Sequence, residues 1–186
     1  MKKKLFTLLL LTSISFTALG QTMAVNNQDS SIHWLAKKVT GQHEGNISIV
    51  DGNLVMQNNT LTGGNFEVDM NSMIVTDLTG EYKEKLEGHL KSDDFFGVAK
   101  FPKANLKITK ATQKMDNHYE VIADLTIKGI TNSIRFDLYI ENKTAISKLT
   151  IDRSKFDIRY GSDSFFDNLG DKTIYDNFEI DVTLKF

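Results

Sequence analysis

The side chains best suited to metal binding or proton transfer in this chain are its four histidines, His33, His43, His89 and His118. Their spacing forms neither H-x-x-x-H nor H-E-x-x-H, the short patterns that bring two imidazoles to one metal ion. Cysteine is absent from the sequence, which excludes thiolate nucleophiles, zinc–thiolate sites and disulfides. The sequence therefore predicts no metal site and no cofactor.

The serines and carboxylates also lack a recognisable reactive arrangement. Gly161-Ser162-Asp163-Ser164 only loosely resembles a G-x-S-x-G nucleophile elbow, and it lacks the strand-to-helix context of such an elbow. Asp93-Asp94 stands beside Phe95-Phe96, and Asp152 precedes Arg153, placements that are typical of caps, turns and ion pairs. Catalytic carboxylates must meet in space, and spacing alone does not establish this. We therefore expect a protein that binds a ligand and is not an enzyme.

Residues 1–20 have the pattern of a secretory signal peptide. Lys2–Lys4 form the positive start, and Leu5–Leu11 begin the apolar core. Small residues precede a cleavage point before Gln21, and a second pair of small residues allows the alternative cut after Ala24. The apolar run is shorter than the roughly 20 residues that span a bilayer, so a retained membrane anchor is the less favoured alternative. Cleavage leaves residues 21–186 as a periplasmic or secreted protein that does not span a membrane.

The remainder has the size and the uniform composition of one domain. It contains no internal repeat and no low-complexity tract, and proline occurs once, at Pro102. The formal net charge of the chain is −2, which gives no support for nucleic-acid binding.

Apolar and polar residues alternate along most of the chain, which is the period-two pattern of strands with one face turned inward. Short connections between such strands favour antiparallel pairing, and eight or nine of them predict a sandwich or barrel. Asp51-Gly52-Asn53 is predicted to be a turn between two of them. The alternating stretches are 32–36, 47–49, 54–56, 66–70, 106–108, 119–127, 134–140 and 178–186, and a further apolar stretch begins at 145 and ends near 151.

Two segments depart from this pattern. Tyr82, Leu86 and Leu90 are four residues apart among charged residues, which predicts an amphipathic helix over residues 79–91 that begins after an N-cap at Thr79. Residues 161–175 are rich in Gly, Asp and Asn. They predict a long loop, either a functional one or a plug whose aromatic residues complete the core.

Four local motifs occur in an order that carries a family resemblance. Residues 31–45 hold an S-I-H-W strand and a glycine–histidine turn, and residues 88–102 hold G-H-L-K-S-D-D-F-F followed by F-P. Residues 125–131 read L-T-I-K-G-I-T, and residues 151–156 read I-D-R-S-K-F. Together they resemble the YceI-like family, also described as polyisoprenoid-binding, extended-lipocalin-like proteins. The resemblance covers nearly all of residues 30–186.

This resemblance implies an all-β fold, a single antiparallel eight-stranded lipocalin-like barrel with one short helical segment. It also implies an exported protein that holds an isoprenoid, quinone or other lipid-like amphiphile in the barrel lumen. Two departures from the family pattern lie in the late loop and bear on the identity of the ligand. Asp157 stands where the family usually has glycine, and residues 165–171 form an additional aromatic-containing segment.

The residues expected to contact the apolar tail are those that alternate toward the interior, although they could instead fill a solid core. Burying such a tail recovers roughly 25 cal/mol per Å² of apolar surface. His89, Asp93 and Asp94 are candidates for positioning a polar head group; the alternative is that they cap the helix and fix the turn before Phe95. The candidate tail-binding residues are Trp34, Phe66, Val68, Leu125, Ile127, Phe136, Phe178, Ile180 and Val182.

Two other functional classes make different structural predictions. A ligand-free structural or interaction module of the cell envelope would have a filled interior and a large exposed apolar patch. A hydrolase or isomerase acting on such a lipid would bring at least two ionisable groups with perturbed pKa values into the cavity. A carrier requires an apolar hollow inside the barrel.

Overall fold

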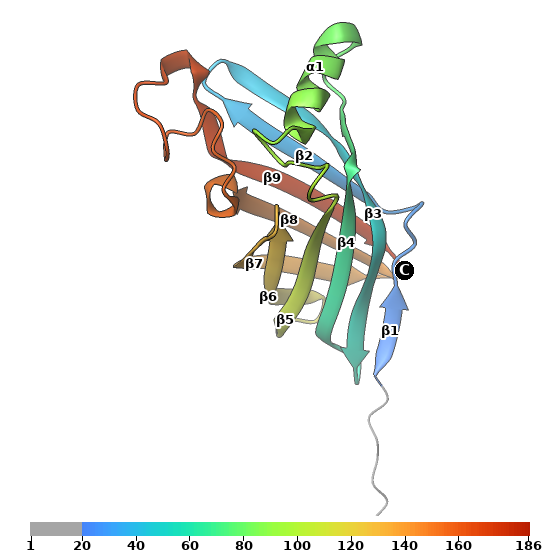
Figure 1. The fold of residues 1–186 in the computed structure, drawn as a ribbon. Helices are drawn as coiled ribbons and strands as arrows, with labels where there is room; N and C mark the ends of the chain where they lie inside the picture. The colour runs from blue at the N-terminus through green and yellow to red at the C-terminus, as the bar shows by residue number, and fades with distance from the viewer. Residues whose placement is uncertain (1–19) are drawn as a thin grey trace, which may run out of the picture.

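The computed structural model describes residues 20–186, so the predicted signal peptide falls outside the described residues apart from Gly20. Nine strands and one α-helix make up the fold, together with two short 3-10 helices (Figure 1). The elements are β1 (Gln21–Ala24), β2 (Ser31–Lys38), β3 (Gly41–Gln57), β4 (Thr60–Val75), α1 (Gly80–Lys91), β5 (Lys103–Met115), β6 (His118–Ile127), β7 (Ile130–Glu141), β8 (Thr144–Asp152), η1 (Arg153–Phe156), η2 (Gly170–Lys172) and β9 (Ile174–Lys185).

The strands form a closed antiparallel barrel, as expected from the sequence. Strands β2 to β9 follow one another in the order β3-β2-β9-β8-β7-β6-β5-β4, and a β3–β4 pairing closes the ring. Strand β1 is an additional short strand that pairs with the second half of β3, through Gln21↔Met56 to Ala24↔Asn53. The expectation of an eight-stranded barrel with one short helix is confirmed.

Tight hairpins connect most neighbouring strands, and left-handed backbone conformations make them. Asn58-Asn59 joins β3 to β4 with φ angles of 50° and 61°, and Asn142-Lys143 joins β7 to β8 with φ angles of 48° and 59°. Two consecutive left-handed residues are the geometry of the hairpin turn that matches strand twist, and asparagine tolerates it well.

The predicted turn at residues 51–53 is wrong, because these residues lie inside the long strand β3. The register of the β3–β4 ladder shifts between Ile49 and Asp51, which marks a bulge at this point. A Cβ at Gly52 would lie 2.6 Å from Cδ1 of Phe66. Glycine is therefore present because an aromatic ring of the neighbouring strand packs against the backbone, and not because the chain reverses.

Helix α1 covers one end of the barrel, where the chain crosses from β4 to β5 (Figure 1). Thr79 occupies the N-cap position, as predicted, but its side chain makes no capping hydrogen bond. Leu86 and Leu90 pack against the core, whereas Tyr82 is 77% exposed and does not belong to the packed face. The Glu87 side chain accepts a hydrogen bond from the Val75 N–H at 2.8 Å, which ties the helix to the end of β4.

Two buried apolar clusters close the two ends of the barrel. The cluster at the α1 end includes Phe95, Val98 and Phe156, and the cluster at the opposite end includes Leu54 and Tyr119. Inward-facing residues of the middle of the strands, such as those of β9, are only partly buried and contact both clusters. A space remains between the two clusters in the middle of the barrel, and members of both line it. Within residues 20–186, none of the helices has the length and apolar character needed to cross a membrane.

Candidate functional site: the barrel lumen

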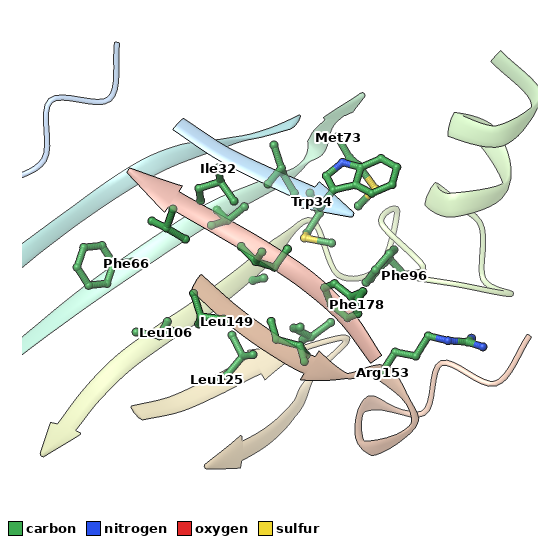
Figure 2. Close-up of a pocket in the computed structure, with 18 of the residues that line it drawn as sticks. Ile32, Trp34, Phe66, Met73, Phe96, Leu106, Leu125, Leu149, Arg153 and Phe178 are labelled. Carbon is green, nitrogen blue, oxygen red and sulfur yellow. The ribbon is translucent and has the colours of Figure 1, made fainter. Parts of the chain in front are cut away.

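A cavity of about 200 Å³ occupies this space inside the barrel. Each of the eight barrel strands contributes side chains to its wall, because alternate residues of every strand point inward. Figure 2 shows Trp34, Phe66, Leu106, Leu125, Leu149 and Phe178 around it, each from a different strand. The wall at the α1 end is completed by Leu90, Phe95 and Phe96.

All nine side chains predicted from strand alternation to contact an apolar tail line this cavity. They are Trp34 of β2, Phe66 and Val68 of β4, Leu125 and Ile127 of β6, Phe136 of β7, and Phe178, Ile180 and Val182 of β9. The predicted positions therefore converge on one hollow and do not form a fully packed core.

The polar residues of the cavity wall are few: Asn105, Ser147, Arg153 and Tyr175. No His, Asp or Glu is among the residues that line it, within the part of the chain that the structure describes. The two converging acid–base groups expected of a hydrolase or isomerase are therefore not found in this lumen. Within residues 20–186, no three His, Asp or Glu side chains are grouped so as to hold a metal ion.

Arg153 is the charged residue of the cavity wall, and its guanidinium is fully engaged in holding the backbone together. It donates to the carbonyl oxygens of Tyr160 at 2.8 Å, Ile174 at 2.9 Å, Ile158 at 3.1 Å and Tyr175 at 3.3 Å. Burial lowers the pKa of Arg153, and the carboxylate of Asp176, 3.3 Å from Nη2, opposes that shift. Arg153 thus joins η1 to the residues just before the long loop and to the start of β9, and its stem lies against the lumen (Figure 2).

The single tryptophan of the chain, Trp34, also lies in the cavity wall. It is 7% exposed, and its indole Nε1 is buried without a hydrogen-bond partner among residues 20–186. Its indole lies against Gly45 of β3, the strand residue directly opposite it. Trp34 therefore reports on the lumen spectroscopically without interference from another tryptophan.

A second, more polar hollow of about 580 Å³ lies at the α1 end of the barrel, and we call it the vestibule. Its charged residues balance, with three basic and three acidic side chains. Among the acidic residues, Asp93 pairs with Lys100 at 2.6 Å, and Asp157 pairs with Arg159 at 2.5 Å. The vestibule is lined by Asp93, Asp94, Lys128, Asp157, Arg159, Tyr160, Gly161, Phe166, Leu169 and Lys172.

Aromatic rings stand between the vestibule and the lumen. Tyr160, a vestibule residue, lies 5.4 Å from Phe95, a lumen residue, measured between ring centroids. The ring of His89 packs edge-on against both, at 4.4 Å from Tyr160 and 5.0 Å from Phe95. The two hollows are therefore neighbours separated by one layer of rings.

The three candidate head-group residues do not reach the lumen. Asp93 and Asp94 line the vestibule, and His89 lies beside it, with its Nε2 3.6 Å from Oδ2 of Asp94. The helix end is closed by a neighbouring residue instead, because the N–H and the hydroxyl of Ser92 both donate to the carbonyl of His89. The structure thus brings the three candidates together at the rim and not at the apolar wall.

Sequence reasoning missed the basic residues of the vestibule. Lys128 lies in the β6–β7 hairpin, and its ammonium donates to the carbonyl oxygens of Asp93 and Asp157 at 3.2 Å. Arg159 lies just before the long loop and Lys172 lies within it, in a part of the chain that carries no periodic signal. The same loop holds Phe165 and Phe166, which are exposed and do not complete the core, so the plug alternative is wrong.

A model of the YceI-like domain matches residues 23–186 of the chain. The chain belongs to the YceI-like family. The resemblance seen in the four sequence motifs is thereby confirmed. The departure at Asp157, where other members usually have glycine, also has a structural reason. Asp157 adopts a left-handed conformation with φ of 57°, which glycine adopts freely and aspartate tolerates.

Curated relatives of this YceI-like chain match a limited segment. A UPF0312 protein of Staphylococcus aureus strain N315 is 39% identical over 72 residues, which is 39% of this chain and 37% of that protein. The corresponding protein of strain USA300 is 42% identical over 72 residues, with the same coverage of both. The matched segment therefore spans little more than a third of these relatives' length.

Solved structures share the fold at low sequence identity. Burkholderia cenocepacia BcnA has a TM-score of 0.67 at 18% identity, with 86% of this chain and 98% of that chain covered. A polyisoprenoid binding domain from Saccharophagus degradans has a TM-score of 0.59 at 12% identity, with 90% and 97% covered. The Campylobacter jejuni YCEI protein has a TM-score of 0.55 at 15% identity, with 99% and 92% covered.

Proposed function

We propose that this protein binds the hydrocarbon tail of an isoprenoid, quinone or other lipid-like amphiphile in the barrel lumen, and that it is not an enzyme. The observation that carries the proposal is the composition of the cavity wall, to which all eight strands contribute apolar side chains. Transfer of a hydrocarbon from water into such a hollow is favourable by roughly 25 cal/mol per Å² of buried apolar surface. The shared fold of a polyisoprenoid binding domain from Saccharophagus degradans supports the same chemistry.

The size of the lumen limits what it holds without rearrangement. Its volume of about 200 Å³ is below the roughly 300–1,000 Å³ of typical ligand pockets and close to apolar cavities that hold one benzene ring. A long tail therefore requires lumen side chains to move. Met70 and Met73, both in the cavity wall, are suited to this because methionine is unbranched and adaptable.

The vestibule is the proposed position of the polar head group. Its basic and acidic side chains offer donors and acceptors to a hydroxyl, carbonyl or ester group, and it adjoins the lumen through the ring layer of Phe95 and Tyr160. His89, Asp93 and Asp94 would act there at the rim. The protein is proposed to work outside the cytoplasm, because its first twenty residues have the pattern of a signal peptide.

Fluorescence titration with cis-parinaric acid, a polyene fatty acid, tests this proposal. We expect quenching of Trp34 by energy transfer to the bound polyene, and competition by an unlabelled isoprenoid alcohol such as geranylgeraniol. Ala104→Phe narrows the lumen, because Ala104 lies in its wall, and is expected to weaken binding at least tenfold, which is about 1.4 kcal/mol.

Lys107→Phe is the matched control for the same strand. Lys107 is exposed on the outer face of β5, so this variant adds the same ring without entering the cavity. Binding that Ala104→Phe and Lys107→Phe affect equally would place the probe outside the lumen and contradict the proposal. Failure of the wild-type protein to bind any apolar probe, together with no hydrophobic molecule in native mass spectra of gently purified protein, would favour a ligand-free module.

A further inference from the structure

The number of paired positions between neighbouring strands varies around the barrel and is lowest between β7 and β8. These strands pair at four positions only, Leu138↔Ser147, Tyr139↔Ile146, Ile140↔Ala145 and Glu141↔Thr144, all next to their hairpin. Their other neighbours are paired along nearly their whole length, from Ile127↔Ile130 to His118↔Tyr139 for β6–β7 and from Thr144↔Lys185 to Asp152↔Asn177 for β8–β9.

The unpaired part of this boundary consists of residues 130–137 of β7 and residues 148–152 of β8, and we call it the seam. Figure 1 shows the two strands close together near the C-terminus and spread apart toward η1. Among residues 20–186, side-chain hydrogen bonds tie the seam at its two ends. Ser147 donates from Oγ to the Asp137 carbonyl at 2.7 Å, and Asn132 donates from Nδ2 to the Lys155 carbonyl of η1 at 2.9 Å.

The seam runs directly along the lumen. Phe136 of β7 and Leu149 and Ile151 of β8 line the cavity, and so do Leu138 and Ser147 at the paired end of the seam. The side chains on the two inner sides of the seam are therefore mostly apolar and already in contact with the lumen.

The two ends of the barrel are less suitable as entrances. At the α1 end, Phe95, Val98 and Arg153 are all buried, and Arg153 is held by four backbone carbonyls. At the opposite end, Leu54 and Leu61 are fully or almost fully buried. Opening either end would expose a packed cluster and, at the α1 end, break buried hydrogen bonds.

We propose that the seam between β7 and β8 is the lateral portal through which the hydrocarbon tail enters and leaves the lumen. This inference rests on the proposed function and adds the route by which the tail reaches the lumen. Parting any fully paired neighbours requires the loss of a row of backbone hydrogen bonds, each of which contributes to stability. Parting the seam requires that apolar side chains separate and that at most the two side-chain hydrogen bonds at its ends break. An entering tail replaces the apolar contacts with its own.

A covalent clamp across the seam tests the portal, because the chain has no cysteine of its own. Extension of the Leu138↔Ser147 register would bring Arg135 opposite Thr150, and both are exposed. The double variant Arg135→Cys/Thr150→Cys is joined with a short bis-maleimide. The matched control is Arg135→Cys/Ile122→Cys, which joins β7 to β6 across the fully paired ladder, where Ile122 lies opposite Arg135.

The measured quantities are the association and dissociation rates of cis-parinaric acid in stopped-flow mixing. The seam clamp is expected to slow both rates about tenfold or more while its equilibrium affinity stays near that of the unclamped variant, because the portal changes a rate and not the bound state. The β6–β7 clamp is expected to leave both rates within about twofold. Ser147→Ala, which removes one tie of the seam, is expected to speed both rates a few-fold.

The outcomes separate the portal from the proposed function. Equal rates in the two clamped proteins, with binding intact, would overturn the portal and leave lumen binding standing. Slowing by both clamps to the same extent would also overturn it, since the route would then depend on general barrel motion. Absence of binding in the unclamped protein would overturn the proposed function and the portal with it.

Discussion

The indole of Trp34 lies directly against the backbone of Gly45, its partner across the β2–β3 ladder. A Cβ at position 45 would come within 2.6 Å of Cζ2 of the indole and would overlap the carbonyl oxygen of Ile74 on β4. Glycine at this position therefore allows the largest side chain of the lumen wall to lie flat against β3. The closeness of these two residues fixes where the indole stands relative to the cavity.

Substitution Gly45→Ala is expected to destabilise the protein by about 1–3 kcal/mol or more, because the backbone carbonyl of Ile74 cannot move away without disturbing the β3–β4 ladder. Urea unfolding measures the loss, and Trp34 fluorescence measures the accompanying change in the lumen. Gly63→Ala in β4 is the control, since the nearest atom to a Cβ there is 3.9 Å away. Equal stability of the two variants would contradict the packing argument.

The lumen was predictable from the sequence because it depends on strand periodicity alone. In a closed barrel, every second residue of a strand points inward, so Trp34, Leu125 and Phe178 could be assigned to the interior before their neighbours were known. The false turn at Asp51–Asn53 shows the limit of this reasoning. Gly52 serves the packing of Phe66, a residue of another strand, and the sequence around it looks the same as that of a turn.

The vestibule and the seam were not predictable, because they depend on contacts between segments distant in sequence. The guanidinium of Arg153 donates to backbone carbonyls that lie up to 22 residues later in the chain. The loop between them has no periodic pattern, so the sequence does not predict where these carbonyls lie. Residues 130–137 have the alternation of an ordinary paired strand. Their lack of partners on β8 follows from where β8 diverges, which the alternation does not encode.

Replacement of the buried guanidinium by an apolar side chain, Arg153→Met, is expected to cost about 3–5 kcal/mol, since four backbone carbonyls lose their donor and Asp176 loses its ion-pair partner. The free energy of unfolding in urea measures this, and hydrogen exchange over residues 161–175 should accelerate. Arg159→Met removes an exposed arginine paired with Asp157 and is expected to change stability by about 1 kcal/mol or less. A similar loss in both variants would show that burial of Arg153 is unimportant.

Acid should weaken the outer face of the barrel through Glu179. Lys148 and Lys37 each place an ammonium nitrogen 2.9 Å from its carboxylate, and hydrogen bonds from these two lysines lower the pKa of Glu179 from 4.5 to about 2. The folded pKa is depressed, so this contribution to stability is present above pH 4.5 and is lost as the pH falls toward 2. The difference in free energy of unfolding between wild type and Glu179→Gln should therefore shrink over this range.

A lysine substitution tests the same pH dependence. Lys148→Met removes one of the two cations beside Glu179 and is expected to move the acid-sensitive range upward, toward the ordinary glutamate pKa. Urea unfolding at a series of pH values between 2 and 7 provides the comparison. A difference between wild type and Glu179→Gln that stays constant with pH would exclude this ion-pair cluster as a source of acid sensitivity.

Because acidic and basic side chains balance in the vestibule, removal of either kind should change which head groups it prefers to bind. Asp93 and Asp94 face the same hollow as Lys128, Arg159 and Lys172. The double variant Asp93→Asn/Asp94→Asn removes two negative charges and leaves the basic side chains less opposed. We expect this variant to bind an anionic amphiphile a few-fold more tightly, because the electrostatic potential of the vestibule becomes more positive. The affinity for an uncharged alcohol with the same tail should stay about the same.

Competition of a fatty acid and of the matching fatty alcohol against cis-parinaric acid, at low and at high salt, measures this preference. The gain for the acid should decrease with added salt, since exposed charges are screened over about 10 Å at 0.1 M ionic strength. The double variant Asp116→Asn/Glu141→Gln removes two negative charges at exposed positions outside the vestibule and controls for net charge. An unchanged ratio of acid to alcohol affinity in the aspartate variant would place the head group away from Asp93 and Asp94. The tail could still occupy the lumen in that case, because the contacts that hold it come from the strands and not from the rim.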